Sequence, residues 1–261
     1  MSAAVTAAPD ALSTAPAAGA APATAAAATE VADVLAACRA IVDERRYARH
    51  PFVAELERRQ PDRAALGRWA VQKYHQVGLQ NTIFAQIHVS AQDHLDVRKW
   101  AIDQLVAEET HHTSGSAGHY VLMRHFAEAC GAPAAMFEST HAAPQVRSYV
   151  GVLNELCGQP DFVLGLLTIH SIESQSAEGV SKLLAWLRAN HTFSDYDLEW
   201  FTVHSEEEDD HADAAMQMIL RYAPGVDDFA HRAPACALRI TEAWLRLQDF
   251  YLELLGERAV P

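Results

Sequence analysis

From Glu30 onward the apolar residues of this chain recur with a helical period, and no stretch alternates apolar and polar residues as a strand does. Pro61 with Asp62, Gly131, and Pro224 with Gly225 interrupt the pattern, and Ser194 with Asp197 forms a helix-capping pair. The predicted helices cover about 31–47, 62–90, 94–113, 117–130, 145–157, 161–190, 195–222 and 232–256. The sequence therefore predicts an all-α bundle of about seven to eight helices.

The first 29 residues differ in composition from the rest of the chain. They are almost entirely Ala, Thr, Pro, Ser and Gly, which cannot bury enough apolar surface to offset the entropy lost on ordering. We expect a disordered tail over 1–29 and a single helical domain over 30–261. The tail has no Lys or Arg before its apolar stretch, which argues against a secretory signal, and no run elsewhere is apolar enough to span a bilayer.

The net charge of the chain limits the kinds of partner that it can bind, and the placement of its cysteines indicates its cellular compartment. The formal net charge is −14, which argues against nucleic acid or an anionic membrane surface as the main partner. The cysteines are widely spaced in apolar helical contexts, with no Cys-x-x-Cys pair: Cys38, Cys130, Cys157 and Cys236. They are expected to be reduced core residues of a cytoplasmic protein.

His204, Glu208 and His211 stand at i, i+4 and i+7 and therefore share one helical face. The same face carries Phe201 and Met218, so it is the buried one. Two imidazoles and a carboxylate in an apolar core need a partner, and a divalent metal is the simplest, because both groups are metal ligands.

Three further places put acidic or imidazole side chains on apolar faces: Glu108 or Glu109, His119, and Glu173. With the triplet they make three carboxylates and three imidazoles. One ion does not use six such ligands comfortably, and three buried negative charges call for more than one divalent cation. Two iron ions with bridging carboxylates fit this set, whereas closed structural zinc sites favour thiolates.

A ferritin-like carboxylate site is an alternative, since Glu109 with His112 and Glu208 with His211 provide two Glu-x-x-His pairs. It fails at the helix from Asp62 to Ser90, which contains no Glu, and it leaves His119 and His204 unexplained.

The assembled residues resemble the haem-oxygenase-like di-iron oxidases and oxygenases, iron-containing redox enzymes related to pyrroloquinoline-quinone synthase-like and thiaminase-II-like proteins. The resemblance covers about residues 50–222. It rests on the Glu pair followed by His119, on Ile172 to Gln175, and on the triplet. It implies a haem-oxygenase-like fold and the metal ligands Glu109, His119, Glu173, His204, Glu208 and His211. Glu109 is preferred to Glu108 only because of its register with related sequences. Glu208 stands where the family usually has Asp.

The resemblance further implies two Fe with O2 as co-substrate, a small-molecule substrate and an external electron donor. We expect an oxidase or oxygenase acting on an amino acid or amine in a biosynthetic pathway, by N-oxygenation, oxidative decarboxylation or C–C cleavage. The alternative is a metal-free cofactor-biosynthesis oxidase or thiaminase-like hydrolase of the same fold. It predicts that the carboxylate and His positions are broken or that a nucleophilic Cys faces the pocket, and it is disfavoured because all six positions are filled. The wide apolar face of the last helix is also compatible with a homodimer.

A few polar residues on apolar helices are candidates for substrate binding. Lys73 with Tyr74, Arg147 and Lys182 are basic or polar groups that could anchor a substrate carboxylate. For each of them, the competing interpretation is a side chain that reaches solvent. The spare imidazoles are His111 and His112, interpreted as exposed at a helix end, and His170, interpreted as a packed residue.

Overall fold

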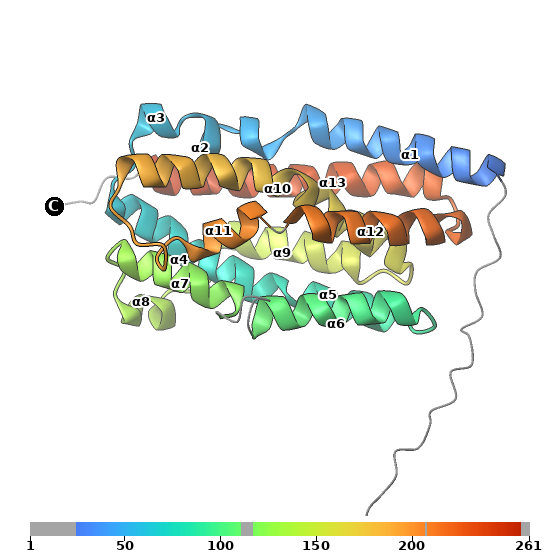
Figure 1. Ribbon diagram of the computed structural model, residues 1–261, viewed down its shortest axis with the longest axis horizontal. Coiled ribbons are helices and arrows are strands. Elements are labelled where there is room, and N and C mark those ends of the chain that lie inside the picture. The colour runs from blue at the N-terminus through green and yellow to red at the C-terminus, as the bar shows by residue number, and fades with distance from the viewer. Residues whose placement is uncertain (1–24, 111–116, 207, 257–261) are drawn as a thin grey trace, which may run out of the picture.

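The structure is a computed structural model that describes residues 25–110, 117–206 and 208–256. The side chains of residues 206–213 also lie outside the described part. Figure 1 shows an elongated bundle whose long helices run roughly along one axis. Across the described ranges there is no strand, so the predicted all-α class is confirmed.

The described elements follow one another along the chain as helices and short 3-10 turns. They are α1 (Ala25–Glu44), η1 (Tyr47–Arg49), α2 (Pro51–Ala54), α3 (Leu56–Arg59), α4 (Arg63–Gln80), α5 (Thr82–Ser90), α6 (Leu95–Glu109), α7 (His119–Ala129), α8 (Ala134–Ser139), α9 (Pro144–Cys157), α10 (Phe162–Asn190), α11 (Glu199–Glu206), α12 (Glu208–Tyr222), η2 (Ala223–Gly225) and α13 (Phe229–Gly256).

Several predicted helix ends have the local cause that the sequence suggests. The Asp62 carboxylate accepts a hydrogen bond from the Ala65 amide at 2.8 Å and caps α4. Ser194 and Asp197 cap one another reciprocally before α11, with distances of 2.8 Å and 3.2 Å. Gly131 has φ +94° just after α7, a conformation that favours glycine.

Other boundaries differ from the prediction. The stretch predicted as one helix over 62–90 is two helices, α4 and α5, with Asn81 between them. Helix α1 begins at Ala25, inside the range predicted to be a disordered tail. The periodicity also missed α2, α3 and α8, because helices of four to six residues are too short to show a 3.6-residue repeat.

The centre of the bundle is α10, which packs against α9, α11, α12 and α13. Helix α13 also contacts α1, α4 and α9, and these contacts explain its wide apolar face. Trp244, Leu247, Tyr251 and Leu255 are all buried within the chain. Because these side chains are buried within the chain, they do not form an exposed apolar surface for a partner. A homodimer through this face stays a prediction.

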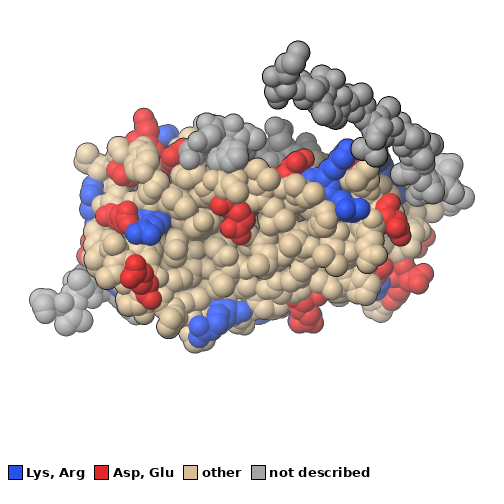
Figure 2. Space-filling view, turned by 90° about the horizontal axis from the view of Figure 1, so that it is seen from below, with Lys and Arg blue, Asp and Glu red and all other residues tan. Residues whose placement is uncertain are grey.

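Figure 2 shows the molecule from the side on which α5 and α6 lie, where uncharged surface separates small groups of charged residues. Val89, Ile102 and Val106 are exposed large apolar residues on these two helices. Within the described residues, no helix combines the length and apolar character needed to cross a membrane.

Candidate metal centre

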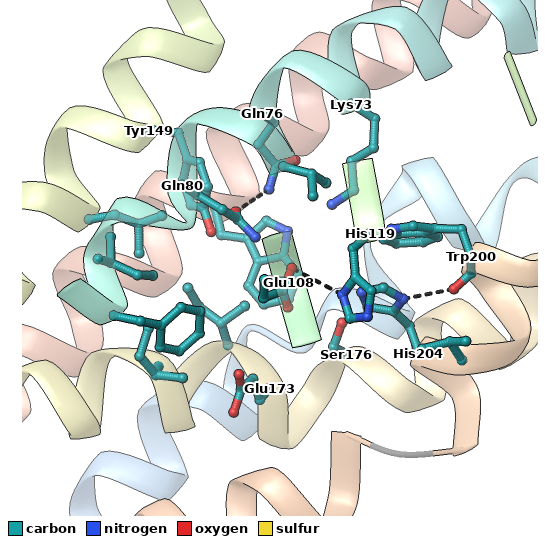
Figure 3. A pocket seen from close by; sticks show the side chains of 18 residues that line it. Lys73, Gln76, Gln80, Glu108, His119, Tyr149, Glu173, Ser176, Trp200 and His204 are labelled. Carbon is teal, nitrogen blue, oxygen red and sulfur yellow. Dashed lines mark hydrogen bonds and ion pairs between the residues drawn. The ribbon is translucent and has the colours of Figure 1, made fainter. Parts of the chain in front are cut away.

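Three of the predicted metal-binding helices bring their side chains to one point. Glu108 lies in the last turn of α6, His119 is the first residue of α7, and His204 lies in α11. Each offers one ligand atom, and the three atoms all lie within 4.8 Å of one another. Glu108 Oε2 is 3.0 Å from His119 Nδ1, and the centroids of the two imidazole rings are 4.5 Å apart. Figure 3 shows the three side chains facing one cavity.

A close backbone approach at Gly118 makes this convergence possible. Gly118 is the N-cap of α7, and a Cβ built on it would lie 2.7 Å from the Glu109 carbonyl oxygen and 3.0 Å from the Glu108 carbonyl oxygen. Only a residue without a side chain lets the start of α7 touch the end of α6. The glycine therefore sets the separation between Glu108 and His119.

The imidazole of His204 is held in one orientation by its own helix. Its Nδ1 donates to the Trp200 carbonyl oxygen at 2.7 Å, and its ring stacks on the Trp200 indole with centroids 4.0 Å apart. A histidine that donates through one ring nitrogen offers the lone pair of the other to a metal. Nε2 of His204 is therefore the ring atom available to a metal.

Of the other predicted ligands, Glu173 lies at this cavity and Glu109 does not. Glu173 in α10 lines the same cavity as the three converging residues. Glu109, preferred from the register, is exposed and lines a separate surface pocket with His75 and Tyr120. The reason is rotational: adjacent helical residues point about 100° apart, so only one of the two carboxylates faces inward. The structure thus puts Glu108 at the cluster and Glu109 outside it.

Glu208 and His211 belong to α12, but their side chains lie outside the described part of the structure. Their role as ligands remains a prediction. His111 and His112 are likewise outside the described residues. His170 is half-buried and lines a different cavity, together with Cys38 and Leu167.

The cavity at the cluster has a free volume of about 80 Å³. Its apolar lining includes Ile83, Phe84, Leu153, Ile169, Ile172, Val203 and Trp244. Tyr149 in α9 is a polar exception. Burial raises the pKa of its hydroxyl above the ordinary value, and the nearby Cys157 and Glu173 raise it further. The hydroxyl therefore stays protonated and is available as a hydrogen-bond donor.

Helix α4 supplies the polar wall of the cavity. Lys73, Gln76 and Gln80 line it, and the ammonium of Lys73 lies 5.0 Å from the centroid of the Trp200 ring. Lys73 was a candidate from the sequence, whereas Arg147 is exposed and Lys182 pairs with Glu178 at the surface. Gln76, Gln80 and Tyr149 were not predicted from the sequence, because nothing in their helical spacing distinguishes them from ordinary surface or core residues.

The donor set suits iron. A carboxylate oxygen and imidazole nitrogens from separate helices are ligands that iron uses, and all of them line one cavity. No cysteine among the described residues lines this cavity. Burial raises the pKa of Cys38 and of Cys130 to about 12, so these two remain neutral thiols.

An all-α bundle that brings a carboxylate and two imidazoles to one cavity is typical of a helical metalloprotein. Residues 67–245 match the haem-oxygenase-like family described as iron-containing redox enzymes, so the chain belongs to this family. The predicted resemblance is confirmed at the level of the family.

Curated relatives carry a biosynthetic name. The chain is 25% identical over 192 residues to a 4-aminobenzoate synthase of Nitrosomonas europaea. The aligned residues make up 70% of this chain and 76% of the relative. It is 21% identical over 178 residues to a 4-aminobenzoate synthase of Chlamydia pneumoniae, and this alignment covers 68% of this chain and 77% of that relative.

Solved structures agree on the fold. A CADD-like protein of unknown function from Nostoc punctiforme superimposes with a TM-score of 0.67 at 13% identity, covering 87% of this chain and 99% of the other. A TenA homolog from Pseudomonas syringae gives a TM-score of 0.66 at 10% identity, covering 86% and 91%. At these identities the likeness shows the fold alone.

Proposed function

We propose that this protein is a non-haem di-iron enzyme that uses dioxygen to oxidise or oxygenate a small molecule. The observation that carries the proposal is the convergence of Glu108, His119 and His204 at one cavity, in a chain of an iron-containing redox family. The favoured substrate is an amino acid or amine, transformed by N-oxygenation, oxidative decarboxylation or C–C cleavage. The 4-aminobenzoate synthase relatives favour a biosynthetic role.

The proposed ligands are Glu108, His119, Glu173, His204, Glu208 and His211, with Glu108 replacing Glu109. Four of these side chains are described, and all four line the cavity. The two from α12 complete the set as a proposal. Two cations would balance three carboxylates that are otherwise costly to bury.

Iron in this donor set would supply electrons to dioxygen and Lewis acidity to the substrate, and an external donor would restore the electrons. The residues of the chain have separate tasks. Trp200 fixes the His204 ring through its carbonyl oxygen, so that Nε2 faces the cavity. The Tyr149 hydroxyl keeps its proton, because burial, Cys157 and Glu173 all raise its pKa. Apolar side chains from α5, α9 and α10 form part of the cavity wall and reduce the contact of the site with water.

The metal-free alternative stays open, because a TenA homolog shares the fold. A thiaminase-like hydrolase of this fold would need a nucleophilic Cys at the pocket, and the described lining residues of the cavity include none. Ferritin-like chemistry would use Glu109 with His112, but Glu109 faces away from the cluster and His112 lies outside the described residues. Reconstitution with iron tests the metal-free alternative, and the comparison of Glu108 with Glu109 variants tests the ferritin-like one.

The test is anaerobic reconstitution of the full chain with Fe(II), with bound iron measured after desalting and oxygen uptake followed on exposure to air. We expect close to two iron ions per chain and oxygen consumption that depends on iron. Only trace iron, with no oxygen uptake, would refute the proposal and favour the metal-free alternative.

A matched pair of neighbouring variants tests the ligand set. Glu108→Gln should lose about half of the bound iron or more, because a neutral amide is a poor iron ligand. Glu109→Gln removes the same charge one residue away and should keep wild-type loading. The opposite ranking would overturn the assignment of Glu108. His211→Ala should also lose iron, and full loading of that variant would remove His211 from the proposed set.

A further inference from the structure

The wall that α4 contributes to the cavity carries three polar side chains on one helical face. Lys73, Gln76 and Gln80 stand at i, i+3 and i+7 and all line the cavity. Figure 3 shows them descending from α4 on one side, with Glu173 on the opposite side. Lys73 reaches the Trp200 ring and thus lies beside the residue that holds His204.

A short hydrogen-bond relay orients the two glutamines. The Tyr251 hydroxyl donates to Gln76 Oε1 at 2.9 Å, and Gln76 Nε2 donates to Gln80 Oε1 at 2.7 Å. Tyr251 is buried, and burial raises the pKa of its hydroxyl, so it keeps the proton that it donates. The side-chain oxygens of Gln76 and Gln80 both accept hydrogen bonds within this relay. The amide nitrogen of Gln80 is therefore the group that can donate to a ligand in the cavity.

The α4 wall therefore presents donors of two kinds: the ammonium of Lys73 and the amide nitrogen of Gln80. An ammonium has no acceptor function at all. The surrounding surface is apolar along α5 and at Leu153, Ile169 and Ile172, while α9 and α10 also contribute the polar side chains of Tyr149, Glu173 and Ser176. A ligand that fits both surfaces has an anionic acceptor at one end and a small apolar body.

We propose that Lys73 and Gln80 bind the carboxylate of a small carboxylic acid or amino acid substrate. The cavity volume of about 80 Å³ favours a substrate with a small body. A carboxylate at Lys73 leaves the rest of such a molecule between the α4 wall and the cluster of Glu108, His119 and His204. This assignment rests on the proposed function, and it names the group by which that site selects its substrate.

The test is calorimetric titration of the anaerobic, Fe(II)-loaded full chain with propionate and with propionamide, which have the same body but differ in charge. The wild type should bind propionate more tightly than propionamide. Lys73→Met should weaken propionate binding by roughly 10- to 100-fold, because a hydrogen bond to a charged group is lost, and leave propionamide nearly unchanged. Lys73→Arg should restore much of the preference for the acid.

Lys99→Met is the matched control. It makes the same substitution at an exposed lysine of α6 and should bind both probes as the wild type does. Iron content is measured for every variant, which separates loss of a carboxylate anchor from loss of metal.

Equal propionate affinity in the wild type and in Lys73→Met, at equal iron content, would overturn the proposal, since the acid would then be held by the metal alone. An equal loss for propionate and propionamide would also overturn it, because Lys73 would then only maintain the shape of the cavity. If the wild type takes up no iron, the proposed function fails, and the same titrations on the metal-free chain decide the carboxylate site separately.

Discussion

Replacing Gly118 with alanine tests whether the contact between α6 and α7 builds the candidate metal centre. The new Cβ would lie 2.7 Å from the Glu109 carbonyl oxygen, 2.9 Å from its carbonyl carbon and 3.0 Å from the Glu108 carbonyl oxygen. These are backbone atoms of a helix end, so the overlap is relieved only if the first turn of α7 moves away from the last turn of α6. The ligand atoms of Glu108 and His119, now 3.0 Å apart, would separate.

The expected size follows from the cost of overpacking. A steric overlap of this kind destabilises a protein by about 1–3 kcal/mol. For a domain of this size each kcal/mol lowers Tm by ~2–4 °C, so Gly118→Ala should lower Tm by ~2–12 °C. Disturbance of the support of a ligand weakens metal binding by about 10- to 100-fold, so iron affinity should fall as well.

Calorimetric melting and anaerobic Fe(II) titration measure the two effects. Gly151→Ala is the control, because Gly151 lies inside α9 with nothing within 4 Å of its added Cβ. There alanine should stabilise the helix by about 0.5–1 kcal/mol. If Gly118→Ala keeps the wild-type Tm and iron affinity, or if both variants raise Tm, then the close approach at Gly118 does not position the site.

Three further outcomes are expected. Phe126→Ala should cost about 3–5 kcal/mol in urea denaturation, because Phe126 is fully buried against Phe201, and a loss below 1 kcal/mol would contradict the described core. Burial lowers the pKa of His75 from its ordinary value of 6.5. As the pH falls below 6.5, the His75 imidazole takes up a proton in the unfolded chain but stays neutral in the folded one. The free energy of unfolding therefore decreases as the pH falls below 6.5. In the metal-free protein, His75→Gln should flatten that decline between about pH 7.5 and 5.5, and an unchanged slope would show that His75 is not its source. Cys38 and Cys130, with pKa values raised to about 12, should react with a disulfide reagent only after unfolding, and rapid labelling of the native chain would show that they are accessible.

Helical periodicity was enough to predict the fold class and most of the long helices. Helices α7, α9 and α10 begin and end close to the predicted positions, because each has an apolar face that repeats over three turns or more. The division at Asn81 was missed, since the apolar period continues through it. What separates α4 from α5 is the way each packs: α4 lies on α7, while α5 lies on α6.

The candidate site was predicted in its residue types and in part of its membership. His119 and His204 were identified because each is a polar residue on an apolar face, and both face the cavity. The choice between Glu108 and Glu109 was beyond the sequence, since it depends on the rotation of the end of α6 about its axis. Gln76 and Gln80 were beyond it as well, because glutamines on a helix are ordinarily solvated and only the neighbouring helices show that these line a cavity. Glu208 stays the ligand prediction that departs from the family pattern.

The relay from Tyr251 through Gln76 to Gln80 means that the last helix of the chain takes part in the chemistry of a cavity formed mainly by helices before it. A mutation at residue 251 would reorient two amides without touching the proposed metal ligands. Such a position would allow the polar lining of the cavity to change between lineages, or under laboratory selection, while the cluster of Glu108, His119 and His204 stays intact. Comparisons among relatives should therefore weigh the residue at this position together with those that line the cavity.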